Sequence, residues 1–174
     1  MAIWTLDTAH SEIEFKVKHM MISSVKGNFE DFKVEVTTES EQLENASVAV
    51  EIDVNSISTK SEQRDQHLKS EDFFNAAQFD QIKFVSTEIK KVSEEEYEVT
   101  GDLTIKGITK PVTFEAEFGG IGKDPWGNQK AGYTVTGKIN RADFGLSWNA
   151  ALETGGVMVS NDVKFQADLQ FVIA

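Results

Sequence analysis

The stretch Val163-Lys164-Phe165-Gln166-Ala167-Asp168-Leu169-Gln170-Phe171-Val172-Ile173 places an apolar residue at every second position. Successive side chains of a β-strand point to opposite faces, so this period predicts a strand with one buried face and one exposed face. The same period recurs in seven earlier stretches, at residues 13–17, 32–36, 48–54, 82–89, 97–105, 112–118 and 133–139. We therefore predict eight strands and an all-β fold.

One region breaks the alternation. Thr59-Lys60-Ser61-Glu62 has the spacing of a capping box, with Thr59 as the N-cap and Glu62 reaching back to it. This predicts a short helix from Lys60 to about Lys69, followed by another helical turn from Ser70. The order is then three strands, an inserted helix and five strands. Because nearly every connection is short, we predict an antiparallel meander that forms a single domain over residues 1–174.

Two architectures bury one face of such strands, a sandwich of two sheets and a sheet closed into a barrel, and alternation alone does not separate them. Small residues occupy apolar positions of the long strands, namely Gly101, Ala116, Gly137 and Ala167. In an eight-stranded barrel such positions leave room inside for one small ligand. The alternative is a fully packed core in which the glycines are ordinary bends.

Composition limits the partners. The 174 residues include 29 acidic and 17 basic ones, a formal net charge of −12, which argues against binding nucleic acid or docking on an anionic membrane. Cysteine is absent, which excludes disulfides and thiol chemistry. The sequence shows no signal peptide and no apolar run near the ~18 residues of a membrane span, so we expect no integral membrane segment and a cytoplasmic location.

Few residues point to catalysis or metal binding. The three histidines, His10, His19 and His67, are never at short ligand spacing, and neither a nucleophile elbow nor a glycine-rich phosphate loop occurs. We predict no catalytic site, no metal and no cofactor. The two arginines, Arg64 and Arg141, either form local salt bridges or, for Arg64 together with His67 or Lys60, meet a polar or anionic lipid head at the barrel mouth.

Several segments form an ordered set across nearly the whole chain. They are Trp4-x-Leu6-Asp7-x-x-His10-Ser11-x-Ile13-x-Phe15-x-Val17-Lys18-His19, Val25-x-Gly27-x-Phe29, Arg64-Asp65-x-His67-Leu68-x-Ser70-x-Asp72-Phe73-Phe74, Ile82-x-Phe84, Gly101-Asp102-Leu103-Thr104-Ile105-x-Gly107-Ile108-Thr109-x-Pro111-Val112 and Arg141-x-Asp143-Phe144-Gly145. Together they resemble the YceI-like family of lipid- or polyisoprenoid-binding proteins.

This resemblance implies an extended lipocalin-like antiparallel β-barrel of about eight strands, open at one end. Its members hold a long apolar molecule, such as an isoprenoid quinone or a polyprenyl phosphate, and are not known as enzymes. Some members are dimers, so the resemblance is compatible with a homodimer. Many carry a secretion signal, which this sequence lacks.

The ligand-binding residues are predicted from the inward phase of each strand and from the motifs around the helix. They are Phe15, Val17, Phe29, Phe84, Leu103, Phe114, Val135 and Phe165 in the pocket, Phe73, Phe74 and Phe144 near its mouth, and Arg64 and His67 at the head group. The predicted function is non-catalytic binding, transport or storage of an isoprenoid or fatty lipid. Two alternatives stay open: an enzyme for a small hydrophobic substrate, with His10 as a buried acid or base, and a packed barrel that serves as a protein-interaction module.

Overall fold

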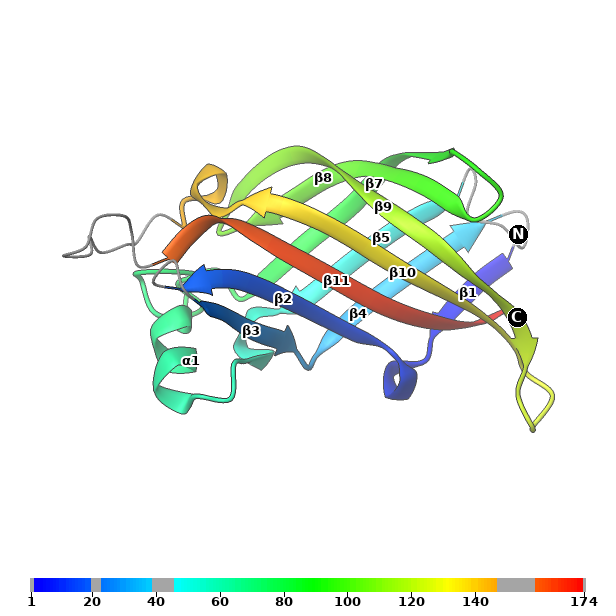
Figure 1. The fold of residues 1–174 in the computed structure, drawn as a ribbon, viewed down its shortest axis with the longest axis horizontal. Helices are drawn as coiled ribbons and strands as arrows, with labels where there is room; N and C mark the ends of the chain where they lie inside the picture. The colour runs from blue at the N-terminus through cyan, green and yellow to red at the C-terminus, as the bar shows by residue number, and fades with distance from the viewer. Residues whose placement is uncertain (1, 20–22, 39–45, 147–158, 174) are drawn as a thin grey trace.

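A computed structural model describes residues 2–19, 23–38, 46–146 and 159–173. One antiparallel sheet curls into an elongated barrel (Figure 1). The elements are β1 (Ala2–Leu6), η1 (Thr8–His10), β2 (Glu12–His19), β3 (Ser23–Phe29), β4 (Phe32–Thr38), β5 (Ser47–Asp53), η2 (Val54–Ser56), β6 (Ile57–Ser58), α1 (Glu62–Lys69), β7 (Gln81–Lys91), β8 (Glu96–Ile105), β9 (Ile108–Lys123), β10 (Gln129–Asn140), η3 (Arg141–Phe144) and β11 (Val159–Ile173). Within these ranges, no helix has the length and apolar character needed to cross a membrane.

Eight of the strands form the closed ring of the barrel. Their order is β1-β4-β5-β7-β8-β9-β10-β11, and the last residues of β11 pair back with β1. Strands β2, β3 and β6 extend the sheet from the earlier part of β11, because β2 pairs with β11 over residues 159–168. The predicted all-β barrel with one short helix is confirmed, and the sandwich is excluded.

The ring contains eight strands, as many as were predicted, but they are not the same eight strands. The stretch at residues 13–17 is β2, which lies outside the ring, and β1 takes its place. Alternation does not predict β1, β3 or β6, so six strands precede α1 where three were expected. Val54, predicted to end a strand, instead begins η2.

Helix α1 begins two residues later than predicted. Ser61 is the N-cap, and its hydroxyl oxygen accepts a hydrogen bond from the backbone N–H of Arg64 at 3.3 Å. Lys60 has a φ of 62°, which turns the chain sharply before the helix. Thr59 is buried, and its N–H and hydroxyl donate to the Asp65 carboxylate at 2.8 and 2.5 Å. The chain therefore uses Thr59 to hold α1 against the barrel and leaves the cap to Ser61.

The two ends of the barrel differ. Both chain termini lie at one end, here called the termini end, and α1 lies at the other, the α1 end (Figure 1). At the termini end, aromatic rings fill the interior. Trp4 stacks on Tyr133 with ring centroids 5.8 Å apart and lies 5.8 Å from Phe171, while Phe118 and Tyr97 lie 5.2 and 6.3 Å from Tyr133. This cluster packs the termini end and leaves free volume nearer α1.

Candidate functional site

The barrel encloses an apolar cavity of about 250 Å³. That volume is slightly below the ~300–1,000 Å³ usual for small-molecule sites. The lining comes from every ring strand except β1, and also from β2, β3, α1, η3 and the segments that follow α1 and η3. Apart from Arg141 and the ring of Tyr133, the lining consists of aliphatic side chains, alanines and phenylalanines. The strands thus enclose a space suited to hydrocarbon that their own side chains do not fill.

Most of the predicted pocket residues lie on this lining. They are Phe15, Val17, Phe29, Phe73, Phe74, Phe84, Leu103, Phe114, Val135 and Phe165. Their inward orientation follows from the alternation of the strands, or from the turn after α1 for Phe73 and Phe74. That they bind a ligand stays a prediction.

Three predicted site residues are not among the described residues of the lining. Arg64 is exposed on α1, where its guanidinium donates to the hydroxyl and carbonyl oxygens of Thr59 at 2.9 and 2.8 Å. His67 forms a 2.9 Å hydrogen bond with Asp72. Phe144 is buried within η3 and is not one of the residues that line the cavity. A role for Arg64 or His67 at a lipid head group stays a prediction that this placement does not favour.

Arg141 is the charged side chain among the described lining residues, and it lies at the α1 end. Its guanidinium donates to the carbonyl oxygens of Ser160 at 2.9 Å, Val159 at 3.3 Å and Leu146, and lies 5.9 Å from the centroid of the Phe73 ring. The residue is 3% exposed, and burial lowers the pKa of the guanidinium, which still stays protonated. The sequence points to Arg141 by the scarcity of arginine, but not to its position on the lining.

Phenylalanine rings fill the space beside two glycines, Gly101 and Gly137, which were expected to leave room inside the barrel. A Cβ on Gly101 would lie 2.7 Å from the Phe84 ring, and one on Gly137 would lie 2.5 Å from the rings of Phe114 and Phe165. The ring centroids of Phe114 and Phe165 are only 4.6 Å apart. The expectation that these glycines leave room for a ligand is therefore wrong, because the cavity is what remains after the rings have packed.

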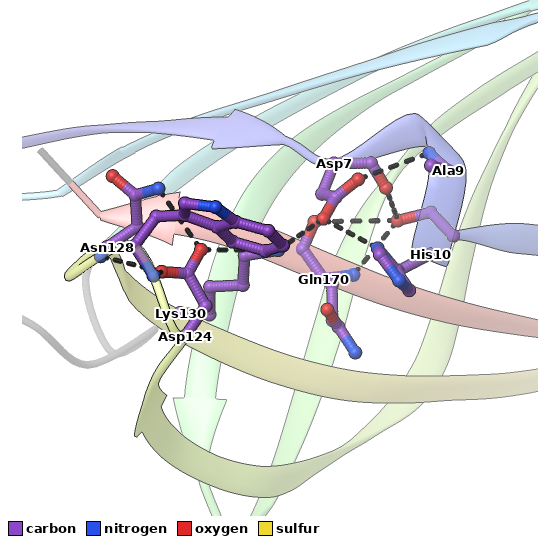
Figure 2. Close-up of polar contacts among 9 residues, drawn as sticks. Asp7, Ala9, His10, Asp124, Asn128, Lys130 and Gln170 are labelled. Carbon is purple, nitrogen blue, oxygen red and sulfur yellow. Dashed lines mark hydrogen bonds and ion pairs between the residues drawn. The ribbon is translucent and has the colours of Figure 1, made fainter.

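A polar cluster around Asp7 lies at the termini end, away from the cavity lining (Figure 2). The Asp7 carboxylate accepts from the Lys130 ammonium at 2.6 Å and from the backbone N–H of Ala9 at 3.2 Å, and it lies 2.9 Å from Nδ1 of His10. Lys130 also approaches Asp124 at 3.9 Å. The His10 side chain is 61% exposed, so the expectation of His10 as a buried acid or base inside the barrel is wrong. The cluster instead ties η1 to β10 and to the turn between β9 and β10.

Acid should weaken this cluster. The pKa of Asp7 is lowered from 3.8 to about 2. The main cause is the hydrogen bond that Asp7 accepts from Lys130, and the hydrogen bond with His10 has a smaller effect. A carboxyl group whose pKa is lower in the folded chain stabilises the fold above its unfolded pKa, and that stabilisation is lost as the pH falls through the folded pKa. From about pH 5 to pH 2, the free energy of unfolding should fall by about 1–2 kcal/mol more in the natural protein than in Asp7→Asn. Urea denaturation across this range measures the difference, and identical pH profiles would contradict it.

The comparisons with known proteins agree with this architecture. The model of the YceI-like domain family matches residues 4–171 of the sequence. The chain belongs to the YceI-like family. It is 49% identical over 175 residues to the UPF0312 protein SAS2572 of Staphylococcus aureus (strain MSSA476). The alignment covers 100% of this chain and 99% of that protein. The resemblance seen in the sequence motifs is thereby confirmed.

Several solved structures superpose on the barrel over nearly its full length. Burkholderia cenocepacia BcnA gives a TM-score of 0.82 at 25% identity, covering 95% of this chain and 98% of that one. The Campylobacter jejuni YCEI protein gives 0.76 at 34% identity, with 95% of each chain covered. A polyisoprenoid binding domain from Saccharophagus degradans, implicated in plant cell wall breakdown, gives 0.75 at 16% identity over 98% of each chain. At that identity the last likeness concerns the fold alone.

Proposed function

We propose that this YceI-like barrel binds a long apolar lipid, such as an isoprenoid, and transports or stores it away from water. The observation that carries the proposal is the apolar cavity of about 250 Å³ inside the ring of strands. Burial of roughly 500 Å² of hydrocarbon gives about 12 kcal/mol before association and ordering costs are subtracted. The polyisoprenoid binding domain is an example of a protein with this fold that is named for this class of ligand.

Arg141 supports a polar or anionic head group at the α1 end. Its guanidinium is buried beside Phe73 and Leu146 on the cavity lining. A charge held in such a low-dielectric site interacts more strongly with a head-group oxygen than an exposed charge does. The hydrocarbon tail then runs from Arg141 towards the aromatic rings around Tyr133.

Two features weigh against the alternative functions. The free volume of the cavity favours a carrier over a packed interaction module. The outward position of His10 removes the residue on which the enzymatic alternative depended.

Mass spectrometry of an organic extract of the natively purified protein tests the proposal directly. We expect a stoichiometric apolar lipid, or, if the protein is isolated empty, saturable binding of an apolar fluorescent probe. A protein that yields no extractable lipid and binds no such probe does not have the proposed function.

A substitution that fills the cavity should abolish binding without unfolding the barrel. Val50 lines the cavity from β5, whereas its neighbour Glu51 is exposed on the outer face. We expect Val50→Trp to weaken probe binding by about tenfold or more, because the indole takes the space of the ligand. Glu51→Trp is the matched control and should bind within about twofold of the natural protein. Equal affinities of the two variants, both shown to be folded by circular dichroism, would place the binding site elsewhere.

A further inference from the structure

Four lysines form a row across the outer face of four neighbouring strands. Lys26 of β3 is directly opposite Lys16 of β2, Lys16 is opposite Lys164 of β11, and Lys164 is opposite Lys138 of β10. All four are exposed. We call these residues the lysine row.

The lysine row is little neutralised by the protein itself. Like charges directly opposite one another on neighbouring strands destabilise a sheet. Lys138 approaches Asp162 at 3.7 Å, but both side chains are well exposed. Lys16, Lys26 and Lys164 form no ion pair with any residue in the described part of the chain. The row therefore keeps concentrated positive charge on a chain whose net charge is −12.

The outer face is hollowed where the lysine row crosses it. The groove has a volume of about 720 Å³ and is lined by all four lysines. Threonine and glutamine side chains share the lining, as do two glutamates, Glu14 and Glu115, on the side towards the termini end. The lysines therefore line a recess that has room for several small anionic groups.

Acidic side chains gather along the other half of the same wall. Glu12 is opposite Asp168, Glu96 is opposite Glu117, and Glu98 is opposite Glu115, all towards the termini end. Glu14 raises the pKa of the adjacent Glu12, chiefly through a hydrogen bond between the two side chains. On this wall the lysine row lies nearer the α1 end, and the acidic residues lie nearer the termini end, where Lys123 and Lys130 are basic exceptions. Such a distribution orients a molecule in the field of a charged surface.

We propose that the lysine row docks the barrel on the phosphate head groups of an anionic lipid bilayer, with the half of the wall that carries the row towards the membrane and the acidic half away from it. Lysine ammoniums are flexible point charges that suit a laterally mobile array of phosphates rather than one fixed partner. The net charge alone argues against such docking, but the local charge at the lysine row is positive. The proposal rests on the proposed function, since the bilayer is then the source or destination of the lipid.

Vesicle flotation at low ionic strength tests this docking. The natural protein should float with vesicles of equal parts phosphatidylglycerol and phosphatidylcholine, but not with phosphatidylcholine alone. Each lysine near an anionic surface raises partitioning roughly fivefold, so Lys16→Glu combined with Lys164→Glu should lower it by more than about tenfold. The control reverses Lys90 and Lys123, which are exposed towards the termini end, and should leave partitioning within about twofold.

Three outcomes would overturn the docking. They are no flotation of the natural protein with the anionic vesicles, equal losses for the two double variants, and binding to soluble polyglutamate without binding to vesicles. The last would assign the lysine row to an acidic protein partner. Uptake of an apolar probe, measured without vesicles, keeps this test separate from the proposed function. Uptake without flotation refutes only the docking, whereas a lack of uptake refutes the carrier itself.

Discussion

Replacement of Arg141 by methionine is expected to lower the free energy of unfolding by about 2–4 kcal/mol. The substitution keeps an unbranched apolar stem but removes every donor of the guanidinium. The carbonyl oxygens of Ser160, Val159 and Leu146 then lose hydrogen bonds, and a buried acceptor left unsatisfied costs about 1–3 kcal/mol. Because these acceptors belong to the start of β11 and to the residues after η3, the α1 end should loosen first.

Arg64→Met is the matched control for Arg141→Met. It makes the same chemical change at the other arginine, which is exposed and whose guanidinium bonds to Thr59 alone among the described residues. Its cost should stay within about 1 kcal/mol. Urea denaturation of both variants gives the comparison, and equal losses would show that the carbonyl bonds of Arg141 do not hold the α1 end together.

Gly101→Ala should be the second strongly destabilising change, by about 2–3 kcal/mol. A Cβ at this position would lie 2.4 Å from the carbonyl oxygen of Val85 and 2.8 Å from the Cα of Ser86. These are backbone atoms of the paired strand β7, next to its irregular register between Ser86 and Glu88. The methyl group can therefore be accommodated only if β7 and β8 move apart.

Gly132→Ala provides the control for Gly101→Ala. Gly132 also lies in a barrel strand, yet no neighbouring heavy atom would be within 4 Å of a Cβ there. We expect a change of less than about 0.5 kcal/mol, with either sign. Thermal unfolding of the two proteins measures the contrast, and a mild effect at Gly101 would mean that β7 yields more easily than its pairing implies.

The inward residues of the barrel could be predicted from the sequence because each strand has one buried face. A shift of the alternation by one residue would expose the whole apolar set, so the pattern is strongly constrained. This is why Phe84, Phe114 and Phe165 lie on the inner face, as the alternation predicts.

What the sequence could not predict depends on residues far apart in the chain. Gly27 breaks the apolar pattern of β3 because a Cβ there would lie 2.4 Å from the ring of Phe15 on the neighbouring strand. The carbonyl groups that accept from Arg141 belong to residues between 5 and 19 positions after it in the sequence. Thr59 is not the cap of α1 for a local reason. Thr59 and Ser61 both have suitable side chains, but the Thr59 hydroxyl donates to Asp65, whereas the Ser61 hydroxyl accepts from the N–H of Arg64.

Phenylalanine rings lie directly over glycines of the barrel strands, so the volume of the cavity depends on single side chains. Alanine in place of Gly137 would push the rings of Phe114 and Phe165 towards the centre, and leucine in place of either ring would open the same region. Neither exchange alters the number, length or register of the strands. Barrels of identical architecture can thus differ in cavity size, and so in the length of the ligand that they bind, through single substitutions.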